Sequence, residues 1–174
     1  KKKVSQEDFI EARDRIVGGL ERKGKLISPK EKQIVAHHEA GHAVVSWYLE
    51  NVESLVKVSI IPRGKSLGAA WYLPEENQII TKTQFTDRIC AALGGRAAEE
   101  VIFNEISSGA IDDLEKVTKQ AYSMVAYYGL NKEIGPLSFY DSTGQNERFL
   151  AKPYSEYLGK RIDQEVIKLI TSEY

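Results

Sequence analysis

The residues His38-Glu39-Ala40-Gly41-His42 form an HExxH pattern, which limits what this chain can fold into more than any other feature. Four residues span slightly more than one turn of an α-helix, so both imidazoles lie on one face and can bind one metal ion. Glu39 stands beside the first histidine, where a carboxylate can reach a metal-bound water and take its proton. The pattern therefore predicts a helix and zinc-assisted hydrolysis, with a peptide bond as the first candidate substrate.

The neighbouring residues favour a helix whose two pattern histidines face the interior. One stripe with helical spacing contains Ile34, His38, His42, Val45 and Leu49. Burying two imidazoles without a partner is costly, so a bound metal explains this stripe better than two unrelated histidines on a surface helix. His37 points about a quarter turn away from the stripe and is expected to be an ordinary helix residue.

Composition indicates the general class of protein. The chain has 174 residues, 42% hydrophobic and 28% charged, with a formal net charge of −1. These values predict a soluble globular domain with one sizeable core, and give no electrostatic case for binding nucleic acid or an anionic membrane. No apolar run is long enough to span a membrane, and the single Cys90 suits a reducing compartment. Because an initiator Met is absent, we expect the chain to be part of a longer protein.

Capping signals and apolar periodicity predict a mainly α fold with a small β-sheet. Five helices are expected: one closed by Gly18-Gly19, one over about 29–50 that carries the HExxH pattern, one over about 82–103, one ended by Gly129, and one that runs to the chain end. Gly94-Gly95 predicts a kink or break in the third helix. Two β-branched or alternating runs, 55–61 and 67–73, predict strands.

The histidine pair needs a third ligand, because catalytic zinc takes three protein ligands and keeps one position for water. A metzincin-type third histidine is excluded, since Val45 and Tyr48 stand where that pattern requires Gly and His. The remaining candidates are acids on the third helix or at the start of the fourth: Glu99, Glu100, Asp112 and Asp113. Acids are also favoured in a first helical turn by the helix dipole alone. These physical arguments leave Glu99, Asp112 and Asp113 open.

Further sequence blocks, spread over nearly the whole chain, resemble the FtsH family of membrane-anchored AAA+ zinc proteases. Besides HEAGH at 38–42, the blocks are KVSIIPRG at 57–64, LG at 67–68, YLP at 72–74, LGGRAAEE at 93–100, SGA at 108–110, DL at 113–114, GL at 129–130 and GPL at 135–137. The resemblance implies Asp113 as the third zinc ligand and Glu39 as the general base. It also implies that Glu99 orients a ligand imidazole. Asp112 occupies a position that is often Asn in the family.

The same resemblance implies a domain division, partners and a location. Residues 1–26 would be the end of an AAA+ lid helix with its linker, and 27–174 a multihelical zinc metallopeptidase domain with one Zn²⁺ ion. ATP would be used only by the missing ATPase domain of a hexameric parent that degrades unfolded polypeptides. The parent would be anchored in a bacterial inner membrane with this domain on the cytoplasmic side, or alternatively in a mitochondrial inner membrane. No contact with a membrane is expected for the fragment itself.

The second predicted strand resembles the family's exposed edge strand near the zinc. An extended peptide could pair with it through main-chain hydrogen bonds, which makes candidate substrate-binding residues of Leu67, Gly68, Ala69, Ala70 and Trp71. A plain structural strand is the alternative. Two other functional classes remain: a metal hydrolase with another substrate, such as an amidase, and a catalytically silent, zinc-stapled assembly module. Glu39 argues against the silent module, because a purely structural site needs no general base.

Overall fold

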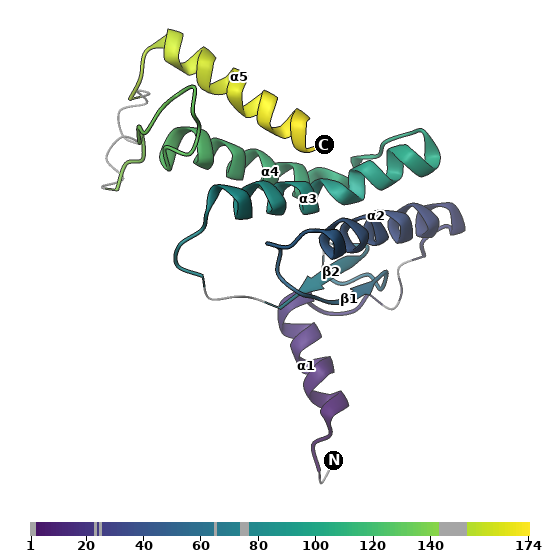
Figure 1. Ribbon diagram of the computed structural model, residues 1–174. Helices are drawn as coiled ribbons and strands as arrows, with labels where there is room; N and C mark the ends of the chain where they lie inside the picture. The colour runs from purple at the N-terminus through teal and green to yellow at the C-terminus, as the bar shows by residue number, and fades with distance from the viewer. Residues whose placement is uncertain (1–2, 23, 25, 65, 74–76, 143–152) are drawn as a thin grey trace.

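The computed structural model describes residues 3–22, 24, 26–64, 66–73, 77–142 and 153–174. The elements are α1 (Gln6–Gly18), α2 (Pro29–Tyr48), β1 (Leu55–Ser59), β2 (Ala69–Tyr72), α3 (Lys82–Phe103), the 3₁₀ turn η1 (Ser108–Ala110), α4 (Ile111–Tyr122), the π-helical turn η2 (Ser123–Tyr127) and α5 (Glu156–Glu173). This architecture confirms the predicted mainly α fold with a small sheet. In Figure 1, α3, α4 and α5 lie above α2 and the sheet, and α1 extends away below them.

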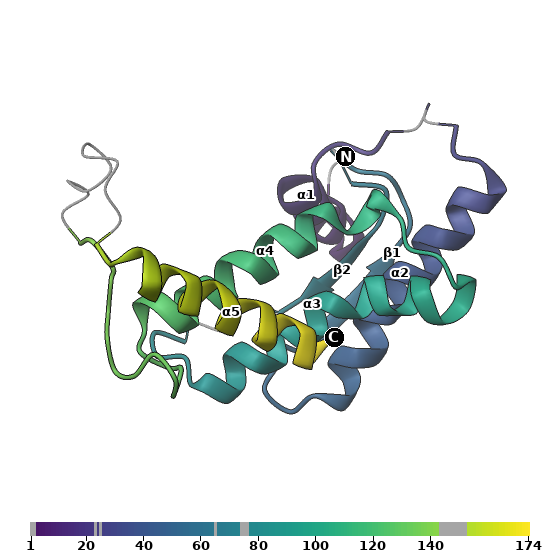
Figure 2. The same ribbon diagram turned by 90° about the horizontal axis from the view of Figure 1, so that it is seen from above.

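The hydrophobic core lies among α3, α4, η2 and α5. Ile89, Val117, Val125 and Ile162, one residue from each of these elements, are almost fully buried in it. Figure 2 shows α5 lying alongside α3 and α4, where it covers this core. α3 therefore has two packed faces, one toward the core and the other toward α2.

Glycines allow α2 and α3 to approach closely. A Cβ atom added to Gly41 of α2 would lie 2.3 Å from the carbonyl oxygen of Gly94, and one added to Gly95 would lie 2.5 Å from Nε2 of His38. The prediction of a break at Gly94-Gly95 was wrong, because α3 continues from Lys82 to Phe103. The glycine pair serves close helix packing, and contact with α2 offsets its low helix propensity.

The sheet consists of β1 and β2, which pair antiparallel with Val58 opposite Ala70 and Ser59 opposite Ala69. Both predicted strands are present, although each is shorter than its predicted run. Within the described part of the chain, no further strand pairs with β2, so its outer edge stays free as expected. None of the helices in the described residues is long and apolar enough to cross a membrane.

Candidate metal centre

Two helices bring three metal-binding side chains together. His38 and His42 come from consecutive turns of α2, and Asp113 comes from the first turn of α4. The two Nε2 atoms lie 3.1 Å apart, and Oδ2 of Asp113 lies 3.3 Å from Nε2 of His38 and 3.4 Å from Nε2 of His42. Among the described residues, these three form the group of His, Cys, Asp and Glu side chains that could hold a metal ion.

Contacts at Nδ1, the ring nitrogen that faces away from the group of three, orient both imidazoles. Nδ1 of His42 lies 2.9 Å from the carbonyl oxygen of Ala91, and this oxygen can only accept, so Nδ1 carries the proton. Nδ1 of His38 lies 2.7 Å from Oε1 of Glu99, whose side chain is almost fully buried. Oε2 of Glu99 also accepts a hydrogen bond from the backbone N–H of Ser107, just before η1. Glu99 thus connects the imidazole of His38 to the turn that leads into α4.

This arrangement suits a cation. With the proton on Nδ1, each neutral imidazole directs the lone pair of Nε2 toward the other and toward the carboxylate of Asp113. Three electron-rich atoms that converge in a largely buried place repel one another unless a positive charge lies between them. Two imidazole nitrogens and one carboxylate oxygen are the ligand set of a catalytic zinc site that keeps one open position. The residues present therefore fit a zinc ion.

Burial and neighbouring imidazoles affect the two acids of the site differently. Burial raises the pKa of Glu39 above its ordinary value, although the nearby His42 and His38 oppose this shift. At Asp113 burial also favours the neutral form, but the adjacent imidazoles of His38 and His42 outweigh it and lower the pKa. Asp113 is thereby kept ionised, as a ligand must be, whereas Glu39 is more basic than an exposed glutamate.

The segment 66–70 places the carboxylate of Glu39. A Cβ atom added to Gly68 would lie 2.6 Å from Oε1 of Glu39, so the carboxylate rests directly against the glycine backbone. The backbone N–H of Ala70 faces the same carboxylate and favours its ionised form. The carboxylate of Glu39, a residue of α2, is therefore held against the backbone at the start of β2.

A cleft of about 810 Å³ runs past the three candidate ligands, and its lining includes Glu39 and Glu99. Four of the five candidate substrate-binding residues also line it, namely Leu67, Gly68, Ala69 and Ala70. Trp71 does not line this cleft; it is buried on the other side of β2, toward α1. Asp112 lines the cleft but is exposed and lies outside the group of three.

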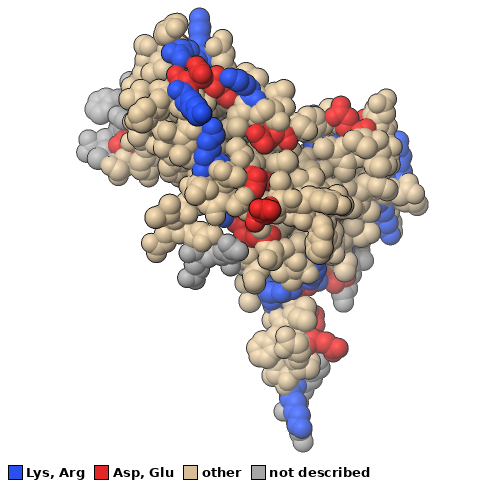
Figure 3. All heavy atoms as spheres, in the orientation of Figure 1, with Lys and Arg blue, Asp and Glu red and all other residues tan. Residues whose placement is uncertain are grey.

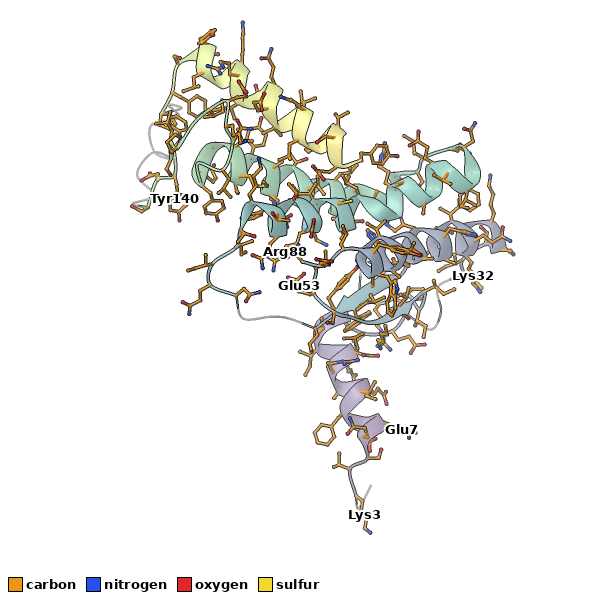
Figure 4. All side chains as sticks on the ribbon, viewed as in Figure 1. Lys3, Glu7, Lys32, Glu53, Arg88 and Tyr140 are labelled. Carbon is orange, nitrogen blue, oxygen red and sulfur yellow. The ribbon has the colours of Figure 1, made fainter. Side chains whose placement is uncertain are left out.

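Two features of the site carried no signal in the sequence. The carbonyl of Ala91 is a main-chain group, so no residue type marks it as the partner of His42. Arg88 and Glu53 form an ion pair in the lining of the cleft, and Figure 4 shows their side chains pointing toward each other. Their separation by 35 residues leaves no local pattern to find.

Elsewhere on the face shown in Figure 3, positive and negative side chains are interspersed.

Comparison with known proteins identifies the family. The family model described as "Peptidase family M41" matches residues 25–174. The chain belongs to peptidase family M41. This membership confirms the predicted resemblance to FtsH proteases and makes the group of His38, His42 and Asp113 the candidate zinc site of a metallopeptidase domain.

Related proteins align with all or nearly all of the chain. It is 58% identical over 174 residues to the ATP-dependent zinc metalloprotease FtsH of Parabacteroides distasonis, and 51% identical over 174 residues to that of Karelsulcia muelleri. It is 50% identical over 171 residues to the mitochondrial inner membrane m-AAA protease component AFG3L2 of Mus musculus. These alignments include 100%, 100% and 98% of this chain but only 25%, 28% and 21% of the relatives. The chain thus spans about a quarter of their length.

Proposed function

We propose that this chain is the zinc endopeptidase domain of an ATP-dependent FtsH-type protease and that it hydrolyses unfolded polypeptides. The observation that carries this proposal is the convergence of His38, His42 and Asp113 beside Glu39 in one cleft. The relatives are named as ATP-dependent zinc metalloproteases, which supports the same reaction class.

Glu39 acts as the general base in this proposal. A zinc ion bound by the three ligands would supply a Lewis acid that polarises the scissile carbonyl and makes the attacking water more acidic. Glu39 accepts a proton from that water and then donates it to the leaving amine. Its raised pKa and its contacts with Gly68 and Ala70 suit this task, because they combine higher basicity with a fixed position.

Glu99 and the carbonyl of Ala91 act through the imidazoles they contact. Each accepts the Nδ1 proton of one ligand, which fixes the tautomer and the ring orientation. Outer partners of this kind typically change metal affinity or activity about 10–100-fold. We therefore assign them positioning roles.

Substrate binds in extended form along the free edge of β2. Main-chain hydrogen bonds would recognise the backbone of any unfolded segment, with little dependence on its side chains. The position of residues 67–70 in the lining of the cleft, beside Glu39, supports this mode. Trp71 faces the opposite side of the strand, so its contribution to substrate binding would be indirect.

The proposal extends to the longer parent protein. Residues 1–26 are the end of an AAA+ lid helix with its linker, and 27–174 are the peptidase domain. Large apolar side chains of the first helix region are exposed and suit contact with a preceding domain: Val4, Phe9, Ile16, Val17 and Leu20. ATP is used by that domain, the parent is a hexamer, and its anchor lies in a bacterial inner membrane or, alternatively, a mitochondrial one.

Metal removal and replacement test the proposed reaction. Unfolded casein and an internally quenched peptide should be cleaved by the zinc-loaded chain, and cleavage should stop on chelation and return when one equivalent of Zn²⁺ is added. A magnesium ion should not restore activity, because it prefers an octahedral set of oxygen ligands. Cleavage that survives chelation, or hydrolysis of small acyl amides alone, would contradict a zinc endopeptidase.

A further inference from the structure

A buried carboxylate holds α1 against the sheet. Asp14 is only 6% exposed, whereas acids are rarely this buried unless they are paired. Lys57 of β1 donates a hydrogen bond to Oδ2 of Asp14 and thereby lowers its pKa. Nη2 of Arg13 lies 3.4 Å from Oδ1, and Nη2 of Arg63 lies 3.9 Å from Oδ2. Asp14 is therefore the centre of a cluster of three cations contributed by α1, β1 and the loop after β1.

Trp71 of β2 lies directly against this cluster. The centroid of its ring is 4.8 Å from Nζ of Lys57 and 5.8 Å from the guanidinium carbon of Arg13, both within the range of cation–π attraction. The last turn of α1 packs on the same ring, since a Cβ atom added to Gly18 would lie 2.9 Å from Cζ2 of Trp71. Movement of α1 would therefore move Trp71.

The backbone that follows α1 is fastened to the same region. The N–H of Arg22 donates to the carbonyl of Pro62 at 2.9 Å, and the N–H of Gly64 donates to the carbonyl of Leu20 at 3.2 Å. These two bonds join the end of α1 to the loop between β1 and β2. Side-chain and main-chain contacts thus act together at one place.

The neighbours of Trp71 face the catalytic cleft. Side chains alternate along a strand, so Ala70 and Tyr72 point away from α1. The hydroxyl of Tyr72 lies 2.9 Å from that of Ser46 on α2, and the N–H of Ala70 faces the carboxylate of Glu39. β2 is therefore held between α1 on one face and Ser46 of α2 on the other, with the carboxylate of Glu39 beside the outer edge of the strand at Ala70.

We propose that Asp14 is a positioning residue for hydrolysis: by fastening α1 to Lys57 and Trp71, it holds β2 in the place that keeps Glu39 aligned. This inference rests on the proposed peptidase function. The three metal ligands belong to α2 and α4, so releasing α1 leaves them in place while the strand beside Glu39 shifts. α1 lies outside the segment 25–174 that matches the peptidase family. In this proposal, α1 affects the rate of peptide hydrolysis although it lies outside the segment that matches the peptidase family.

Two substitutions release α1 by different means. In the zinc-loaded chain, Asp14→Asn removes the charge that pairs with Lys57, and Gly18→Ala places a Cβ atom against Trp71. Both should lower kcat on an internally quenched peptide by about 10- to 100-fold, the size expected for a misplaced catalytic group, with zinc affinity unchanged. Trp71 emission should shift to longer wavelength as α1 leaves the ring. The matched control is Glu11→Gln, an exposed acid on the same helix, which should behave like the parent.

The Lys57 side of the contact provides a rescue test. Lys57→Arg keeps the positive charge and should retain near-parent kcat, whereas Lys57→Met should reproduce the loss seen with Asp14→Asn. The double variant Asp14→Asn/Lys57→Met should lose no more than either single variant, because both remove the same contact.

Three results would overturn the proposal. Unchanged kcat in Asp14→Asn and Gly18→Ala would show that α1 does not influence Glu39. A loss of zinc or of cooperative melting that matches the loss of activity in both variants would make Asp14 a purely structural residue. A parent chain that cleaves no peptide would overturn this proposal together with the peptidase function, whereas a parent and an Asp14→Asn variant that cleave equally would overturn this proposal alone.

Discussion

At the scale of single residues, the site depends on which of two adjacent acids reaches the histidines. Oδ2 of Asp113 lies 3.3 Å and 3.4 Å from the two Nε2 atoms, whereas the side chain of Asp112 is exposed. One position along a helix changes direction by about 100°, so neighbouring acids cannot both face the same metal. The choice between them follows from how α4 packs on α3, which in turn packs on α2.

Zinc affinity should separate these two acids. Asp113→Asn should weaken zinc binding strongly, because an amide replaces a charged ligand, while Asp112→Asn should have little effect. Glu99→Gln should lie between them, at about 10–100-fold, because it disturbs the tautomer of His38 without removing a ligand. Competition with a chromogenic chelator measures all three. Equal zinc loss in the two aspartate variants would contradict the assignment of Asp113.

At the scale of elements, the two edges of β2 should differ in function. The N–H of Ala70 points toward Glu39, and donors alternate sides along a strand, so the N–H of Ala69 points toward β1. Ala69→Pro should therefore weaken the pairing with β1 and lower the melting temperature. Ala70→Pro should reduce peptide turnover with a smaller effect on melting.

Zinc content must stay at the parent level in both proline variants. Otherwise a change in peptide turnover could result from metal loss and not from the altered β2 backbone. If peptide cleavage is unchanged in both, β2 is scaffold and substrate binds elsewhere.

The contact between α4 and α5 should make stability depend on alkaline pH. The hydroxyl of Tyr122 donates to Asp163, and this bond raises the pKa of Tyr122 to about 12, against about 10 in an unfolded chain. A raised folded-state pKa adds stability that is fully present below pH 10 and is lost as the pH rises toward 12. Urea unfolding should therefore show Tyr122→Phe less stable than the parent at pH 9, with the difference shrinking by pH 11.5.

Tyr157→Phe, at an exposed tyrosine of α5, is the control and should show no such trend. A difference between parent and Tyr122→Phe that is constant over this pH range would argue against the coupling.

At the scale of the whole molecule, the sequence predicts what depends on local patterns. The helix that carries His38 and His42 and the mainly α class follow from periodicity and capping. The break expected at Gly94-Gly95 failed because local propensity does not include the contact with Gly41 on another helix. Long-range packing also explains why physical arguments alone left Glu99, Asp112 and Asp113 open as the third ligand. The same limit applies to the docking of α1, which depends on contacts of Asp14 with residues more than 40 positions away.

The whole account depends on Glu39 acting on a substrate beside a zinc ion held by three other residues. Glu39→Gln tests this most directly, with peptide turnover, zinc content and melting temperature measured on the same preparation. The account predicts a fall in turnover of at least about 10²-fold, the lower range for loss of a general base, with zinc content and melting close to the parent. Near-parent turnover in a zinc-loaded, folded Glu39→Gln chain would contradict it.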